Sequence, residues 1–423
     1  MIDAKLIRSD PDGVRQALKR RGADEAVDAF LELDAERRRL LGAVEQSRAD
    51  ANAAAKEIGR AKQAGDDTAI AIARQAQLKH QTAADEAQLS EVESRLRELM
   101  VGIPNLPDPT AADGLEEEDA ETIRTWGEKP EFDFEPKDHY DLCGPDGLGL
   151  IDTEAAARVS GSRFHYLLGD LVRLEFALVQ WAIEKLVANG HTPVIPPVLV
   201  REEAMIGTGF FPEARSQVYQ TATDDLFLVG TSEVPLASFH GGRVFAEDEL
   251  PVYYAGYSTC FRREAGAAGK DTRGIFRVHQ FDKVEMFVYC MPERSNEEHD
   301  RILAIEEEIA QELGFHYRVQ NIAVGDLGAS AAKKYDIEVW LPGQQRYREL
   351  TSCSNCTDYQ ARRLDTRVRT EAGMRHVHML NGTAVTSSRT LIGLIEYGQQ
   401  ADGSIRTPEV LHRFGAPPLI GRG

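Results

Sequence analysis

Six basic side chains lie close together in one stretch of an acidic chain. The stretch FRREAGAAGKDTRGIFRVHQFDKVE spans residues 261–285, whereas the whole chain has 49 Lys and Arg against 69 Asp and Glu, a formal net charge of −20. A guanidinium holds a phosphate or carboxylate through two donors, and small Gly and Ala residues let a loop close over a ligand without steric clash. The stretch predicts an anion-binding site with the cations Arg262, Arg263, Lys270, Arg273, Arg277 and Lys283.

The same stretch predicts two strands that flank the loop, YYAGYSTCFRRE and IFRVHQFDKVEMFVY. Side chains alternate between the faces of a strand, so Arg262 and Glu264 should share one face and Arg263 should point to the other. A carboxylate can accept from an exocyclic amino group, and a Phe ring offers a flat surface to a base. These faces suit a nucleotide, although solvated cross-strand ion pairs are an equal alternative. On the second strand, one parity comprises Arg277, His279, Phe281, Lys283 and Glu285.

The stretch RELTSCSN (348–355) adds a carboxylate and hydroxyls on another predicted strand. Its polar residues are Glu349, Thr351 and Ser352. This combination suits Mg²⁺, which takes few protein ligands and keeps phosphate and water oxygens. The stretch therefore favours the nucleotide interpretation of the neighbouring cations.

The stretch NGTAVTSSRTLIGLIEYG (381–398) predicts a strand that runs into an amphipathic helix. Ser387 or Ser388 is expected to cap the helix, and Gly398 is a plausible end. Arg389 would then lie at the positive end of the helix, a suitable place for a terminal phosphate. A single Arg at a helix start is usually only a surface residue, so this motif depends on the others.

Residues 28–100 have a different composition, rich in Ala, Gln, Glu and Arg and without Pro, Trp or Tyr. Apolar residues recur there at alternating three- and four-residue spacing on both sides of AGDD (64–67), which predicts an antiparallel helical hairpin. Such a hairpin could be a spacer or dimerisation element, which is the simpler interpretation from its charge balance. Its basic residues nevertheless cluster, in ERRRL (36–40) and at Arg48, Lys56, Arg60 and Lys62.

The rest of the chain alternates between predicted helices and strands after a Pro-punctuated acidic linker at 101–121. Because several strands follow one another through short turns, a mostly antiparallel sheet in an α+β fold is expected. The domains are expected at 1–110 and 111–423. The predicted helices span about 165–189, 231–240, 297–313 and 388–397, and the further strand candidates are TPVIPPVLV, DLFLVG, DIEVWL and YRELTSCSN.

The composition excludes several classes of protein. The amino terminus lacks the apolar segment of a secretory signal, and no apolar run reaches the roughly 18 residues that a membrane span needs. Five cysteines, an odd number, indicate a reducing compartment rather than a disulfide framework. Cys353 and Cys356 form a C-x2-C pair without a second pair at zinc-site spacing, so no structural zinc is expected. These features predict a cytoplasmic protein.

Taken in order, the motifs resemble those of the class II aminoacyl-tRNA synthetases, and specifically the bacterial seryl-tRNA synthetases. The resemblance runs from MIDAKLIRSDPDGVRQALKRRG to ADGSIRTPEVL and includes a long helix before a strand ending at Pro197, FRREAG…RGIFRVHQF and NGTAVTSSR. TSEVPL, FDKVEMF, YDIEVWLP and RELTSCSNCTDYQARR are similar to the seryl branch in particular. The resemblance implies an antiparallel catalytic sheet, an amino-terminal coiled coil that grips the long variable arm of tRNA(Ser), and a homodimer with its contact around Pro197.

The resemblance also implies roles for individual residues. Arg262 would bridge the serine carboxylate and the α-phosphate, and Arg389 would meet the γ-phosphate, which makes these two the catalytic candidates. Glu349 and Ser352 would hold Mg²⁺. The implied ATP site comprises Arg262, Arg263, Glu264, Val278, Phe281, Glu349, Leu350, Thr351, Ser352 and Arg389. The implied serine site comprises Thr231, Ser232, Glu233, Arg262, Glu285 and Thr383.

Two features depart from the family pattern, and two other functions compete with this one. Thr383 stands where the family usually has Ser, and Ser387-Ser388 stands where Val-Gly is common, so the local geometry there is in question. T-S-E at 231–233 would also fit a plain helix cap.

Two other functions are alternatives. The chain could load a carrier protein instead of tRNA, but such a protein would not need the intact hairpin. It could also be a non-catalytic nucleotide sensor or scaffold, but this is opposed by the presence of Arg262, Glu264, Glu349 and Arg389 together. Whether tRNA(Sec) is also a substrate is left open by the sequence.

Overall fold

The computed structural model describes residues 1–65, 67–265, 269 and 271–421. Lys270, one of the cations in the predicted loop, lies outside the described residues. The chain forms two compact units, Ile2–Ile103 and, with Met1, Pro104–Gly423. No helix of the described ranges is long and apolar enough to cross a membrane.

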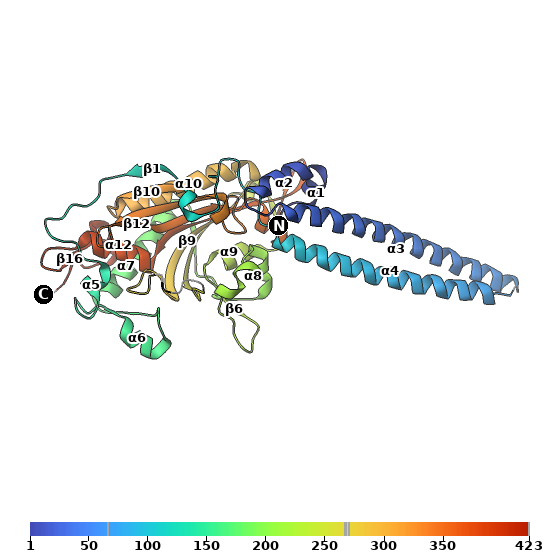
Figure 1. Cartoon of the computed structure of the whole chain (residues 1–423), viewed down its shortest axis with the longest axis horizontal. Coiled ribbons are helices and arrows are strands. Elements are labelled where there is room, and N and C mark those ends of the chain that lie inside the picture. Colours follow the sequence, from blue (N-terminus) through green and yellow to red (C-terminus); the bar gives the residue numbers. More distant parts are fainter. Residues whose placement is uncertain (66, 266–268, 270, 422–423) are drawn as a thin grey trace. The chain divides into compact units, whose positions relative to one another are not determined.

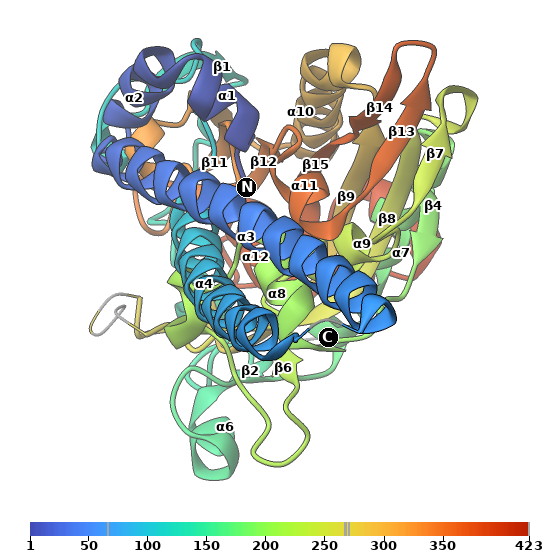
Figure 2. The ribbon, with the colours of Figure 1, turned by 90° about the vertical axis from the view of Figure 1, so that its right-hand side faces the viewer.

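The first unit contains the predicted helical hairpin. Helices α3 (Glu25–Ala64) and α4 (Ala69–Gly102) lie side by side along their length, after the short helices α1 (Ala4–Ser9) and α2 (Pro11–Lys19) (Figures 1 and 2). Gly65 ends α3 in the left-handed conformation, with φ of 82°, as a glycine permits. The predicted antiparallel hairpin is confirmed, and some of its apolar residues are buried between the arms: Leu40, Val44, Ile58 and Val92.

Polar contacts also join the two arms. The guanidinium of Arg48 contacts Glu86 at 2.6 Å, Arg37 contacts Glu93 at 3.2 Å, and the Ser47 hydroxyl donates to Asp85. Part of the predicted basic cluster therefore pairs with the opposite arm rather than with solvent. Such exposed pairs each contribute little to stability, so the packed seam holds the hairpin.

The second unit is built on a mostly antiparallel sheet, as predicted, whose central strands run side by side in Figure 2. Among the described residues the sheet has eight strands, and β4 joins it in parallel with β8. In order across the sheet they are β1 (Glu121–Trp126), β10 (Tyr317–Asn321), β11 (Lys333–Leu341), β12 (Arg346–Asn355), β15 (His378–Thr386), β9 (Gln280–Cys290), β8 (Val252–Phe261) and β4 (Thr192–Val194).

The central strand β9 separates two hydrophobic cores by simple alternation. Val284, Met286 and Val288 point into one core, which the long helices α7 (Asp170–Ala188), α10 (Ser295–Glu312) and α12 (Ser387–Gly398) cover. Phe287 and Tyr289 point into the other core, against α9 (Glu233–Ser238) and α11 (Tyr359–Leu364). Glu285 belongs to the second parity, so it faces the α9 side of the sheet.

Smaller elements complete the second unit. The short helices are α5 (His139–Cys143), α6 (Thr153–Ser160) and α8 (Glu202–Thr208). The accessory strands are β2 (Ile151–Asp152) with β3 (Tyr166–Leu167), β5 (Leu199–Val200) with β6 (Phe227–Leu228), β7 (Val244–Ala246) with β13 (Arg367–Thr370) and β14 (Gly373–His376), and β16 (Ile405–Arg406) with β17 (Leu419–Ile420).

Several predicted boundaries are wrong in detail. TPVIPPVLV is not one strand: β4 ends at Val194 and β5 begins at Leu199 in another sheet, because the prolines between them lack the N–H that a ladder requires. The strand therefore does not reach Pro197. Helix α7 begins at Asp170 rather than near 165, and α9 is shorter than 231–240. Thr386, not Ser387 or Ser388, occupies the N-cap of α12, without a side-chain cap hydrogen bond, and Gly398 is its last residue.

Candidate active site

A carboxylate at the middle of the sheet organises the predicted serine pocket. Glu285 on β9 lies opposite Thr383 of β15 and Gly256 of β8. Its Oε2 accepts hydrogen bonds from the hydroxyls of Thr231 and Ser232, the latter at 2.9 Å, and from the backbone N–H of Glu233 at 3.1 Å. The T-S-E motif therefore does more than begin α9, because it delivers its donors to the carboxylate of another strand.

Lys283 adds a cation to the same pocket, two residues before Glu285 and on the same face of β9. Its Nζ lies 2.8 Å from Glu285 Oε2 and donates to Thr231 Oγ1 at 2.7 Å. All three side chains are buried. The sequence placed Lys283 among the cations without assigning it to the serine pocket, although its strand parity with Glu285 was the available signal.

A second carboxylate, Glu233, lies beside this cluster at the start of α9. Burial, and then the nearby Glu285 charge, raise the pKa of Glu233 to about 7. Glu233 Oε1 accepts from Nε2 of the fully buried Gln360 at 2.7 Å, and the same amide donates to Thr208 O at 3.1 Å. Gln360 thus fixes the orientation of a carboxyl group that can change its charge near neutral pH.

A bulge in β12 places Glu349 and Ser352 on one face of the sheet. Ile337 of β11 lies opposite Thr351, and the next residue of β11 lies opposite Glu349, which leaves Leu350 as an extra residue. Without the bulge, residues three apart would point to opposite faces. The shift therefore directs the predicted Mg²⁺ ligands, a carboxylate and a hydroxyl, to the same side.

Glu349 remains charged although it is partly buried, with its side chain 39% exposed. Burial opposes the charge, but Arg389, Lys334 and Arg262 together lower the pKa of Glu349 to about 2. Arg389, in the first turn of α12, contacts Glu349 Oε1 at 2.9 Å. Asp336, paired with Lys334 at 3.2 Å, has its pKa raised by burial to about 7. Carboxyl groups and several cations therefore lie together at this end of the cavity.

The residues that flank the predicted loop meet at its base. β8 ends at Phe261, so Arg262 and Glu264 lie beyond the strand and their positions do not follow from strand alternation. Glu264 adopts a left-handed conformation, with φ of 50°, and pairs with Arg277 at 2.7 Å. Arg262 donates from Nε to Gly230 O at 3.1 Å, and its guanidinium carbon lies 5.2 Å from the centre of the Phe281 ring.

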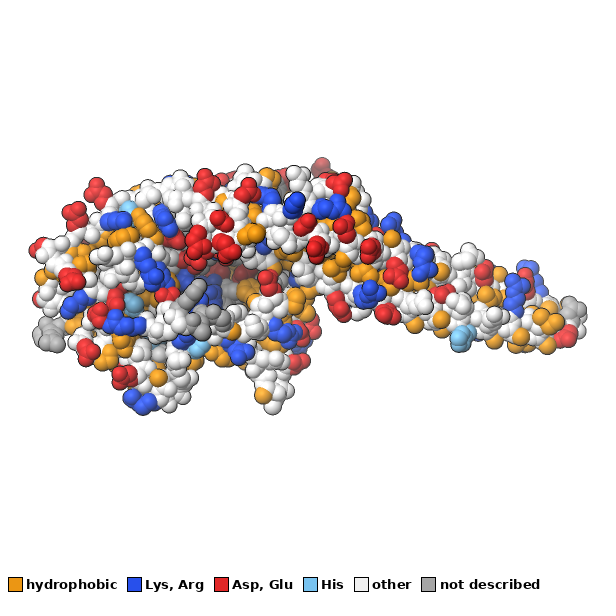
Figure 3. Space-filling view, viewed as in Figure 1, with side chains coloured by type: hydrophobic (Ala, Val, Ile, Leu, Met, Phe, Trp, Pro, Cys, Tyr) orange, Lys and Arg blue, Asp and Glu red, His pale blue; other side chains and the backbone are white. Residues whose placement is uncertain are grey.

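Most of the predicted site residues line one cavity of about 480 Å³. Acidic and basic side chains gather around a hollow on the face that Figure 3 shows. The predicted residues in the lining are Thr231, Glu233, Arg262, Glu264, Val278, Phe281, Glu285, Glu349, Leu350, Thr351, Ser352, Thr383 and Arg389. The sequence missed other lining residues, among them Phe276, Lys334, Asp326 and Asn381, whose types and spacing give no signal in the sequence.

Three predicted residues are placed elsewhere. Arg263 lines a second hollow with Tyr219 and Gln220, not the cavity of Arg262, which agrees with the predicted separation of the two arginines but not with a place in the ATP site. Ser232 lies behind the cavity, bonded to Glu285. His279 turns away from the cavity, because its Nδ1 bonds Arg262 O at 2.8 Å and its ring packs on Phe164.

The metal-binding residues can be compared with the chemistry of the expected ion. Among the described residues, His, Cys, Asp and Glu nowhere form a group of three that could hold a metal. The charged Glu349 and the Ser352 hydroxyl nevertheless suit Mg²⁺, which takes its other ligands from phosphate and water. All five cysteines are buried and free of disulfides, and burial raises the pKa of Cys143 to about 12 and of Cys260 to about 11.

Known proteins resemble this chain in both of its parts. The family model of the seryl-tRNA synthetase N-terminal domain matches residues 1–107, and that of the tRNA synthetase class II core domain (G, H, P, S and T) matches residues 217–397. The serine–tRNA ligase of Nocardia farcinica is 48% identical over 419 residues, 98% of each chain. The serine–tRNA ligase of Streptomyces coelicolor is also 48% identical over 419 residues, 98% of this chain and 97% of that one.

Solved structures show the same similarity in three dimensions. The crystal structure of seryl-tRNA synthetase from Pyrococcus horikoshii complexed with ATP superposes with a TM-score of 0.94 and 41% identity, covering 100% of both chains. The cytoplasmic serine-tRNA ligase from Naegleria fowleri in complex with AMP gives a TM-score of 0.88 and 35% identity, covering 99% of this chain and 98% of that chain.

Proposed function

Because the chain belongs to the seryl-tRNA synthetase family, we propose that it activates L-serine with ATP and transfers the seryl group to the 3′ end of tRNA(Ser), and to that of tRNA(Sec) where this tRNA is present. The observation that carries the proposal is the single cavity that joins the polar Glu285 pocket to the cations Arg262 and Arg389. The pocket suits a small amino acid with a hydroxyl group, and the cations suit a triphosphate.

The pocket recognises serine by its two polar ends. The carboxylates of Glu233 and Glu285 face the ammonium group and the hydroxyl of serine, and the Thr383 hydroxyl lies beside them in the lining of the cavity. An apolar amino acid would leave these buried groups unpaired, which is the effective way to reject it. Threonine is the difficult competitor, because it differs from serine by one methyl group.

The first reaction needs positioning rather than a nucleophilic side chain. The serine carboxylate attacks the α-phosphorus in line, which forms seryl-adenylate and releases pyrophosphate. Arg262 binds the carboxylate and the α-phosphate and stabilises the charge that develops there. Arg389, at the start of α12, holds the γ-phosphate, while Phe281 supports the adenine and Glu264, beside Arg277, accepts from its amino group.

Mg²⁺ would be held by Glu349 and Ser352, which the β12 bulge directs to the same side. Bound there, the ion shields the charge of the triphosphate. Arg389 contacts Glu349 directly and would hold this carboxylate in place as a ligand for the ion. The low pKa of Glu349, about 2, keeps this ligand ionised at physiological pH.

The second reaction requires tRNA, and we assign its binding to the amino-terminal part, residues 1–110, with the helical hairpin as the arm. Residues 111–423 then form the catalytic domain, in a cytoplasmic protein. The homodimer would form around Pro197, where the apolar Ile195 is 82% exposed. Ion pairing between the arms leaves Arg39, Lys56 and Arg60 exposed for RNA phosphates.

ATP–pyrophosphate exchange with each of the proteinogenic amino acids, followed by charging of total tRNA, tests the proposal. We expect strong exchange with serine alone, and serine on the 3′ end of tRNA. Equal exchange with threonine or alanine would refute the serine assignment. Exchange without charging would instead indicate transfer to a carrier protein.

A further inference from the structure

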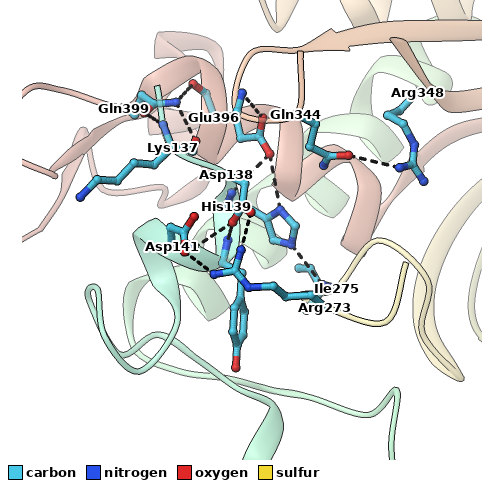
Figure 4. A network of polar contacts seen from close by, with 12 residues as sticks. Lys137, Asp138, His139, Asp141, Arg273, Ile275, Gln344, Arg348, Glu396 and Gln399 are labelled. Carbon is cyan, nitrogen blue, oxygen red and sulfur yellow. Dashed lines mark hydrogen bonds and ion pairs between the residues drawn. The ribbon is translucent and has the colours of Figure 1, made fainter. Parts of the chain in front are cut away.

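A buried histidine lies under the carboxyl-terminal side of the 265–274 loop. His139, the first residue of α5, is 3% exposed, and its Nε2 lies 3.1 Å from the backbone nitrogen of Ile275 (Figure 4). A backbone N–H can only donate, so Nε2 must accept, and the ring proton of the neutral histidine lies on Nδ1. Nδ1 lies 3.5 Å from Glu396 Oε1.

Glu396 holds the histidine from the other side. This carboxylate, in the last turn of α12, is fully buried, and it accepts from the backbone N–H of His139 at 3.3 Å and of Gly343 at 2.9 Å. A buried carboxylate with several donors is a fixed anchor. A continuous chain of contacts therefore runs from the turn at Gly343 through Glu396 and His139 to Ile275.

The loop residues approach His139 as closely as a backbone can. Gly274 has φ of 74°, and a Cβ built there would lie 2.2 Å from His139 Nε2. The guanidinium of Arg273 contacts Asp138 at 2.6 Å and also contacts Asp141. These two residues precede and follow His139 in the sequence. The imidazole of His139 thus contacts the backbone at Ile275, directly after the loop and before the residues that line the cavity.

The residues directly after Ile275 belong to the ATP end of the cavity. The guanidinium carbon of Arg348 lies 3.4 Å from the centre of the Phe276 ring, and that of Arg389 lies 4.9 Å from it. Arg277 pairs with Glu264 across the base of the loop. A shift of the Ile275 backbone would move Phe276 and Arg277 together, and with them the environment of Arg389.

We propose that His139 is a positioning residue for ATP binding: through its bond to the Ile275 N–H it sets Phe276 and Arg277, and it leaves the Glu285 pocket untouched. The inference rests on the proposed function, and it adds a residue outside all the sequence motifs. Since His139 lines neither the cavity nor the serine pocket, it acts only through the backbone it holds.

Two substitutions separate this role from general stability. His139→Leu fills the space without an acceptor, whereas the amide oxygen of His139→Gln can reach the place of Nε2 and accept from Ile275 N–H. In ATP–pyrophosphate exchange, His139→Leu should raise KM for ATP about tenfold or more, as loss of a buried hydrogen bond implies, with KM for serine changed less than about twofold. His139→Gln should restore KM for ATP to within about threefold of the parent protein.

A second readout does not depend on activity. Arg273 is held by Asp138 and Asp141 next to the His139 contact, so trypsin should cleave after Arg273 faster in native His139→Leu than in the parent or in His139→Gln. The matched control is His191→Leu, since His191 is another buried histidine, bonded to Leu186 O and remote from the loop. It should change neither KM for ATP nor the cleavage rate.

The possible results distinguish failure of the positioning role from failure of the proposed function. If His139→Leu raises both KM values together, or leaves KM for ATP and the cleavage after Arg273 as in the parent, the positioning role is wrong. If the parent protein shows no serine-dependent exchange, the proposed function fails, while faster cleavage in His139→Leu alone would still establish that the histidine holds this segment.

Discussion

Arg262 and Arg263 are neighbours in the sequence whose side chains enter different hollows. Arg262 lies beside Phe281 in the cavity with Glu349, and Arg263 lies with Tyr219 outside it. We expect Arg262→Ala to lower kcat/KM for pyrophosphate exchange, because a charge-assisted contact to a developing charge is lost. The loss of transition-state stabilisation should be about 3 kcal/mol or more. Arg263→Ala should be milder. A larger loss in Arg263→Ala would show that the two side chains exchange places when ATP binds.

If Glu233 binds the serine ammonium as proposed, serine binding should depend on pH. Its pKa is raised from 4.5 to about 7, so the carboxyl is mostly neutral at pH 6 and mostly charged at pH 8. The charged form attracts the serine ammonium, and KM for serine should fall by up to about tenfold between these pH values, as one ionising group allows. Glu233→Gln should have a higher KM that no longer varies over this range. A parent KM that rises with pH would contradict the assignment.

The same raised pKa has the opposite effect on folding. A carboxyl that is harder to ionise in the folded chain favours the fold fully below its ordinary pKa of 4.5. This contribution is lost as pH rises through about 7. The fold therefore loses some stability in the pH range where Glu233 gains the charge that its proposed role requires.

Strand β8 and helix α9 approach each other at Gly256, opposite Glu285. A Cβ there would lie 2.7 Å from Leu236 Cδ1 and 3.0 Å from Ser232 Oγ. Gly256→Ala should therefore lower the free energy of unfolding by about 1–3 kcal/mol, as overpacking does, and raise KM for serine by displacing Ser232. Thermal unfolding and exchange kinetics measure both.

The matched control is Gly59→Ala on α3, where a Cβ meets nothing within 4 Å. There the helix should gain about 0.5–1 kcal/mol, since glycine is a poor helix former. If Gly256→Ala were as stable as Gly59→Ala, with an unchanged KM for serine, the tight approach of α9 to β8 would have no role in the pocket.

Strand alternation accounts for the part of the site that the sequence predicted well. The parity of β9 correctly placed Phe281, Lys283 and Glu285 on one face, because that strand is regular from Gln280 onward. The same rule failed to predict the direction of the His279 side chain, and it does not apply to Arg262. Both residues lie beyond the strand ends. A periodicity holds only where the ladder of hydrogen bonds enforces it.

Features set by contacts between distant elements could not be predicted. The bulge at Leu350 depends on how β12 pairs with β11, and no residue type in RELTSCSN marks it. His139 acts from a short helix far from the motifs in sequence, and Gln360, although it lies within RELTSCSNCTDYQARR, has a contact with Glu233 that only the fold shows. The resemblance to a known family supplied the ligands, but the supporting residues became evident only from the fold.

The hairpin and the catalytic unit should separate by function. Arg37 and Glu93 join the arms near their base, so a short linker can replace residues 30–97. We expect this deletion to leave serine-dependent exchange nearly intact and to reduce tRNA charging greatly. If the parent protein forms the proposed homodimer, the deletion should leave its sedimentation state in analytical ultracentrifugation dimeric. Charging equal to that of the full chain would mean that the hairpin is only a spacer.

Charge reversal tests the arm without removing it. Arg39, Lys56 and Arg60 are exposed on α3, and the ion pairs found in the described part of the chain do not include them. Reversing all three should weaken charging most strongly at low salt, and the difference from the parent should shrink at higher salt, because the variant has lost phosphate contacts that release counterions. Exchange with serine and ATP serves as the control and should not change. Equal charging at all salt concentrations would place the RNA elsewhere.

The five buried cysteines have a practical consequence for measuring the motion of this molecule. Thiol-reactive dyes attack the ionised sulfur, and here burial both shields each sulfur and keeps it protonated. The native chain should therefore stay unlabelled by a maleimide dye. A single cysteine introduced at an exposed hairpin position such as Ala87 would carry the dye alone, so that energy transfer to a fluorescent tRNA could report the arrival and departure of the RNA in real time.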